Sequence, residues 1–133
     1  MKLGIQWIIL PTKNYTASRA FYTEKLGFTI DREVATDEFC QFNLGTCYLA
    51  IFNHANLSKL LGAAHGGNAG GAVYSFPEST DIDADYTELV NKGVQFFMPP
   101  TTQAWGQRTA YFTDPDGHIW ELQQWVKSSI STY

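Results

Sequence analysis

The 133-residue chain repeats one order of predicted strands and helices, and this repeat limits the fold more than any other feature. In the first half, hydrophobic and turn patterns predict a strand, a helix and three strands, at 3–10, 15–26, 28–34, 39–43 and 47–52. In the second half, the same patterns predict the same order again, at 72–76, 82–92, 94–98, 107–113 and 118–125. The letters Tyr-Thr-Glu at 22–24 also recur at 86–88. A repeat of this length predicts an α+β fold with two tandem βαβββ modules.

The two modules are expected within one domain spanning residues 1–133, the first at about 3–54 and the second at about 72–126. The segment between them, about 55–71, carries five of the eleven glycines. It has no Gly-Lys-Ser/Thr sequence and no strand leading into a helix, which argues against a phosphate-binding loop. We expect a flexible connector with one short helical turn.

Charge and composition exclude several classes of protein. The 9 basic and 13 acidic residues give a net charge of −4, and the basic residues form no cluster, so nucleic acid is not an expected partner. No apolar run approaches the ~20 residues of a membrane span, and the first residues do not have the pattern of a signal peptide. A cytoplasmic protein is therefore expected, with no membrane partner and with Cys40 and Cys47 as reduced thiols.

The last predicted hairpin shows which side chains share a face. Asp114-Pro115-Asp116-Gly117 has the residues of a type I turn followed by a glycine at positive φ. Such a turn places Tyr111 opposite Glu121 and Thr109 opposite Gln123. One face then carries mixed polar and aromatic residues, namely Gln107, Thr109, Tyr111, Thr113, Ile119, Glu121, Gln123 and Trp125. The other face is apolar and suits packing under a helix, with Ala110, Phe112, Trp120 and Leu122.

The face with Tyr111 and Glu121 is not ordinary core, because burying a carboxylate without a partner costs several kcal/mol. Local pattern leaves two alternatives open: this face is open to solvent, or it lines a polar cavity. Two curved sheets, each backed by one helix, would enclose a cleft between the modules, and small molecules bind in such clefts.

Two stretches, 20–28 (AFYTEKLGF) and 111–122 (YFTDPDGHIWEL), resemble the vicinal oxygen chelate superfamily. This superfamily includes glyoxalase I, extradiol dioxygenases and bleomycin resistance proteins. The second stretch is the more specific, and the resemblance covers nearly the whole chain. It implies the glyoxalase/bleomycin resistance fold, with paired βαβββ modules, a cleft site and a homodimer.

Enzymes of that superfamily hold a divalent metal at four positions, mostly with His and Glu. In this chain the resemblance places those positions at Trp7, within 48–52, at Val73 or Tyr74, and at Glu121. Only Glu121 is a usual ligand, and a divalent site needs three or four. The histidines do not replace the missing ligands, since they are expected on the surface or in loops: His54, His65 and His118. No metal and no cofactor are therefore expected.

The nearest type within the superfamily is the metal-free bleomycin resistance type, which the segment 104–108 (AWGQR) resembles. In those proteins a similar Trp-Gly segment borders the groove that stacks flat rings of the drug, and Trp105 would take that role here. The first hypothesis is sequestration of a planar aromatic or cationic compound, such as an antibiotic. The residues expected to bind it are Trp7, Tyr48, Trp105, Thr109, Tyr111, Glu121 and Gln123.

Two enzyme hypotheses remain as alternatives. In the first, a metal-free enzyme uses Glu121 as a general base beside Tyr111. In the second, a metal-dependent lyase, isomerase or dioxygenase binds its ion through Glu121 and other ligands. The sequence does not identify the ligand.

Overall fold

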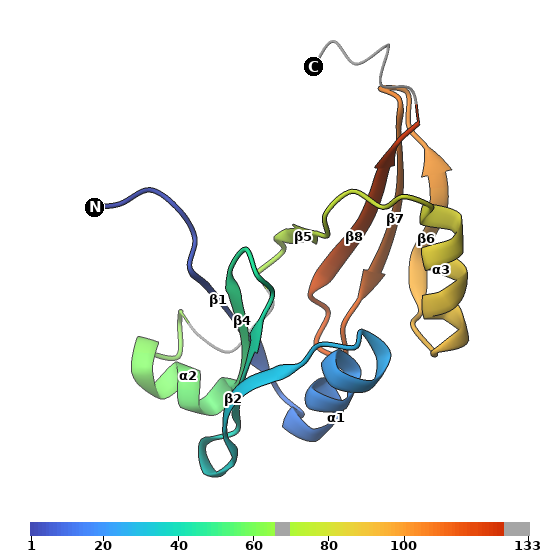
Figure 1. Ribbon diagram of the computed structural model, residues 1–133. Helices are drawn as coiled ribbons and strands as arrows, with labels where there is room; N and C mark the ends of the chain where they lie inside the picture. Colours follow the sequence, from blue (N-terminus) through green and yellow to red (C-terminus); the bar gives the residue numbers. More distant parts are fainter. Residues whose placement is uncertain (66–69, 127–133) are drawn as a thin grey trace. The chain divides into compact units, whose positions relative to one another are not determined.

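The computed structural model describes residues 1–65 and 70–126, in two compact units that cover 1–70 and 71–133 (Figure 1). The first unit contains β1 (Trp7–Thr12), α1 (Tyr15–Ala20), η1 (Phe21–Lys25), β2 (Ile30–Val34), η2 (Ala35–Asp37), β3 (Phe39–Asn43), β4 (Tyr48–Asn53) and α2 (His54–Leu61). The second unit contains β5 (Val73–Ser75), α3 (Ile82–Asn91), β6 (Phe96–Thr102), β7 (Gln107–Thr113) and β8 (Ile119–Trp125).

Each unit has one four-stranded sheet, and the strand orders correspond. The first sheet runs β1-β4-β3-β2 and the second runs β5-β8-β7-β6. In both sheets, the first strand of the unit lies at one edge and pairs in parallel with the fourth strand, which lies inside the sheet. The remaining pairs are antiparallel. The α+β fold with two βαβββ modules is therefore confirmed.

The two edge strands β1 and β6 differ most from their predicted bounds. β1 begins at Trp7 rather than at residue 3, because Trp7 is the first residue that pairs with β4, at Tyr48. It also continues through Pro11, and β6 contains two prolines where the prediction ended at 98. A proline in an edge strand costs little when its missing N–H would face away from the sheet.

The expectation of a mostly non-helical connector is wrong for residues 55–61, which belong to α2. The Asn53 side chain begins this helix by accepting the N–H groups of Ala55 and Asn56 at 2.9 and 3.1 Å. Leu57 is buried, so the helix also packs on unit 1. Residues 66–69 of the predicted connector lie outside the described residues.

The first predicted helix is present, but its second half is wound more widely than an α-helix. Asn14 caps α1 by accepting the Ala17 N–H at 3.1 Å. From Phe21 to Lys25 the chain continues as one wider helical stretch, η1. Gly27 then takes φ +74, a left-handed conformation that suits the end of a helix. The next strand begins at Ile30 rather than at residue 28.

The apolar face of the second sheet packs under α3, as predicted. Ala110 and Phe112 are fully buried, and Trp120 and Leu122 nearly so. Figure 1 shows α3 lying along the β6–β7–β8 sheet. Asp81 caps this helix by accepting the Ala84 N–H at 3.1 Å, which also confirms the predicted start.

The β7–β8 turn has the predicted chemistry. The Asp114 Oδ1 accepts the backbone N–H groups of Asp116 and His118, both at 2.9 Å, and Gly117 takes φ +89. His118 lies in the loop between β7 and β8, as expected, but it is only 4% exposed and so is not on the surface. A position next to a turn therefore does not by itself make a residue exposed.

No helix within residues 1–65 and 70–126 is both long enough and apolar enough to cross a membrane.

Candidate functional site

One face of the second sheet carries the side chains that the hairpin register predicted. The structure pairs Tyr111 with Glu121, Thr109 with Gln123 and Gln107 with Trp125. We call this surface the Glu121 face. Because the opposite face is filled by the packing of α3, the Glu121 face is the side of this sheet on which polar groups remain accessible.

A phenol and a carboxylate meet at the centre of the Glu121 face. The Tyr111 hydroxyl donates to the Glu121 Oε2 at 2.6 Å, and both side chains are half-buried. Burial raises the pKa of the Tyr111 phenol above its usual value, and the hydrogen bond to Glu121 raises this pKa further. Tyr111 therefore stays protonated at neutral pH and acts as a hydrogen-bond donor.

A line of hydrogen-bonded amides runs along this face from a loop tryptophan. The Trp105 Nε1 donates to the Gln107 Oε1 at 3.0 Å, and the Gln107 Nε2 donates to the Gln123 Oε1 at 3.1 Å. The Gln123 Nε2 donates to the Phe76 carbonyl at 3.3 Å. These bonds orient the Trp105 indole while leaving its side chain 43% exposed.

Thr109 lies beneath this line rather than on its surface. Its side chain is fully buried, and its hydroxyl accepts a hydrogen bond from the Gln103 Nε2 at 3.1 Å. Gln103 and Gly106 also close the loop before β7 through backbone hydrogen bonds. Thr109 therefore holds the loop that carries Trp105.

Trp7 and Tyr48, the two remaining predicted ligand-binding residues, lie together in the first unit. They are register partners on β1 and β4, and their rings stack with centroids 5.0 Å apart and planes 21° apart. The Trp7 Nε1 donates to the Gln41 Oε1 at 3.0 Å, and the Gln41 Nε2 donates to Asp31 at 2.9 Å. The seven predicted residues thus form two groups, one in each unit.

Sequence reasoning missed two residues of these groups, Gln41 and Phe97. Gln41 is 6% exposed and fixes the Trp7 indole. Its signal was an amide between the apolar residues of the strand FCQFN. Phe97 stacks on Tyr111, with ring centroids 6.0 Å apart. An irregularity between Phe96 and Met98 turns Phe97 toward Tyr111, and no sequence pattern signals it.

The positions of the superfamily's metal do not provide its usual ligands in this chain. Ser75 pairs with Glu121, so Val73 and Ser75 share its face, while Tyr74 lies on the other face against Trp120. On β1 and β4 the positions hold Trp7 and the stretch YLAIF. Across residues 1–65 and 70–126, no three His, Cys, Asp or Glu side chains gather in a way that could hold an ion. The donor set does not fit a divalent metal.

Comparisons with known proteins agree with this fold. The family model of the glyoxalase/bleomycin resistance protein/dioxygenase superfamily matches residues 4–122. An uncharacterized protein from Shewanella frigidimarina is 28% identical, with 93% of this chain and 95% of that protein covered. A glyoxalase/bleomycin resistance protein/dioxygenase from Nocardioides superposes with a TM-score of 0.80 at 26% identity, covering 96% of this chain and 87% of that one.

A glyoxalase-related enzyme from Fulvimarina pelagi is similar at the same level. Its TM-score is 0.78 at 26% identity, and the match covers 90% of this chain and 86% of that chain. The family model spans most of the sequence, and both modules have the strand order that the resemblance implied. The chain therefore belongs to the glyoxalase/bleomycin resistance protein/dioxygenase superfamily.

Proposed function

We propose that this protein binds and sequesters a planar small molecule on the Glu121 face, without a metal. The proposal rests on one observation. The same face carries the accessible indole of Trp105 and the carboxylate of Glu121, whose hydrogen-bonding capacity is only partly used. Among the described residues, only Tyr111 donates to Glu121, through Oε2, so Oε1 keeps its capacity to accept. A flat ligand that bears a positive charge or an N–H group matches this arrangement.

Stacking on Trp105 supplies the second part of the proposed recognition. Within the described part of the chain, its indole ring has no aromatic partner, and its N–H is already held by Gln107. A ring stacked on it gains ~1 kcal/mol beyond the burial of apolar area. A cation also gains from the electron-rich face of an indole, by ~0.5–1 kcal/mol at an exposed site. The homodimer that the resemblance implies stays a prediction.

Tryptophan fluorescence with 9-aminoacridine, a planar cation, tests this proposal. We expect saturable quenching, weaker binding of neutral acridine, and an affinity at least about fivefold lower in Trp105→Ala, because one stacking surface is lost. Trp105→Phe is the matched control and retains most of the affinity, since it keeps a ring. Quenching that does not saturate, or that Trp105→Ala leaves unchanged, contradicts the proposal.

Metal analysis of protein purified without a histidine tag tests the proposed independence from metal. Because a single carboxylate does not retain a divalent ion, we expect far less than one ion per chain. One tightly held ion per chain that is lost in Glu121→Gln would show that ligands other than those described complete a site. That result would favour a metal-dependent enzyme instead.

The 2.6 Å hydrogen bond between Tyr111 and Glu121 favours a second candidate function, metal-free acid–base catalysis. In this candidate, Glu121 takes a proton from a bound substrate while Tyr111 donates a hydrogen bond to the same carboxylate. Glu121→Gln separates the two functions once a ligand is known. Turnover collapses if Glu121 is a base, whereas binding by stacking weakens only modestly.

A further inference from the structure

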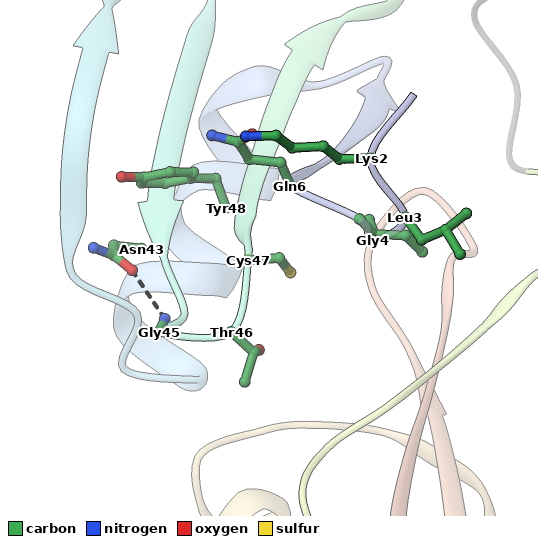
Figure 2. Close-up of a pocket in the computed structure, with 10 residues that line it drawn as sticks. Lys2, Leu3, Gly4, Gln6, Asn43, Gly45, Thr46, Cys47 and Tyr48 are labelled. Carbon is green, nitrogen blue, oxygen red and sulfur yellow. Dashed lines mark hydrogen bonds between the residues drawn. The ribbon is translucent and has the colours of Figure 1, made fainter.

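We propose that the first unit carries a separate binding site for a small aromatic carboxylate. The site is a hollow of about 440 Å³ between the segment before β1 and the turn that joins β3 to β4. Figure 2 shows Lys2 and Gln6 from the first of these segments, Cys47 from the turn, and Asn43 and Tyr48 from the strand ends beside the turn. Its volume lies within the range of sites that enclose small ligands.

The charge of the lining points to an anion. Among residues 1–65 and 70–126, Lys2 is the one positively charged side chain that lines the hollow, and no Asp or Glu of these residues lines it. The chain as a whole has a net charge of −4, so the lining differs in sign from the molecule. A bound carboxylate would meet Lys2 without repulsion from a neighbouring acid, whereas a cation would meet only repulsion from Lys2.

Neutral polar groups in the lining add hydrogen-bond donors for a carboxylate. The Asn43 Oδ1 accepts the Gly45 N–H at 2.9 Å, as the dashed line in Figure 2 marks. This bond uses the acceptor of the amide and leaves its NH₂ group as a donor. The Gln6 amide and the Thr46 hydroxyl also line the hollow, so a carboxylate has several donors within the same walls.

Tyr48 supplies the surface for an aromatic ring. One side of its ring stacks on Trp7, which holds the ring in place. The Tyr48 side chain also lines the hollow. A ring that enters the hollow adds its own area to an already oriented pair, at little cost in side-chain entropy. An aromatic ring with one carboxylate therefore matches the walls better than an aliphatic acid.

Cys47 offers a direct reporter of occupancy, because it lines the hollow and is partly exposed, whereas Cys40 is fully buried. The experiment alkylates the folded protein with iodoacetamide, a small neutral reagent, and follows each cysteine by mass spectrometry. 1-Naphthoate is the probe, and 1-naphthamide is its neutral counterpart. We expect naphthoate to slow alkylation of Cys47, with half-protection at a concentration about two- to fivefold lower than for naphthamide.

Lys2→Gln is expected to abolish the difference between naphthoate and naphthamide. Lys59→Gln makes the same change of charge on α2, outside the hollow, and is expected to preserve the difference. Equal protection by both compounds in the unmodified protein, or no protection by either, overturns the proposal. Trp105→Ala separates this site from the Glu121 face: protection of Cys47 persists in this variant if the hollow binds the probe, and its loss would overturn the proposal.

Discussion

Phe112→Ala is expected to lower the free energy of unfolding by about 3–5 kcal/mol, which is the largest effect of a single substitution that we predict. Phe112 is fully buried on the face of the second sheet that packs under α3. Its ring lies 5.1 Å from that of Phe96 and 6.3 Å from that of Phe76, measured between centroids. Alanine would leave a cavity that these rings cannot fill without moving the strands. Urea unfolding followed by circular dichroism measures the loss.

Phe97→Ala is the matched control, since it removes the same ring from the adjacent strand β6. Phe97 is 58% exposed, so its removal is expected to cost less than about 1 kcal/mol. If both variants lost the same stability, the two faces of this sheet would not differ in burial as described. The α3 side would then not be the core of the second unit.

The hairpin register could be predicted because its chemistry is local. Asp114 and Gly117 set the turn through backbone hydrogen bonds and positive φ, and the turn alone determines which residues face each other. Alternation along two strands then separates the Glu121 face from the apolar face. The pairing of Tyr111 with Glu121 follows from these two rules and needs no knowledge of the remaining chain.

Features that depend on distant parts of the chain could not be predicted in this way. The start of β1 depends on where β4 begins, which no local pattern near residue 7 encodes. The hydrogen bond between Trp7 and Gln41 joins residues 34 positions apart. Phe97 joins the Glu121 face only because β6 is irregular beside β7. In each case the deciding partner lies on another strand.

The length of helix α2 could not be predicted for a different reason. Its sequence, HANLSKLL, stands beside a glycine-rich segment, and the composition of the whole stretch predicted a connector. The deciding signals were the capping side chain of Asn53 and the apolar position Leu57, which a window dominated by glycine hides. In so short a segment, the capping side chain has more influence on helix formation than the overall composition has.

A cluster of polar contacts in the first unit joins α1 to Glu33 on β2. The Arg19 guanidinium donates two hydrogen bonds to this carboxylate, at 2.8 and 3.0 Å, and the Tyr15 hydroxyl donates one at 2.5 Å. The Glu33 side chain is 22% exposed and that of Arg19 is 40% exposed, so solvent weakens the ion pair but does not remove it. Arg19 first, and then Tyr15, lower the pKa of Glu33 below its ordinary value of 4.5.

Glu33→Gln is accordingly expected to cost about 1–2 kcal/mol of stability at pH 7, since three bonds to a charged acceptor become weaker or are lost. Because the folded protein lowers the pKa of Glu33, its contribution is complete above pH 4.5 and disappears as the pH falls through the folded-state pKa. The urea midpoints of the variant and the unmodified protein should therefore differ at pH 7 and converge below pH 4.5. Glu24→Gln, an exposed position in the same unit, should match the unmodified protein throughout. A gap that stayed constant with pH would mean that Glu33 stabilises the fold by packing rather than by charge.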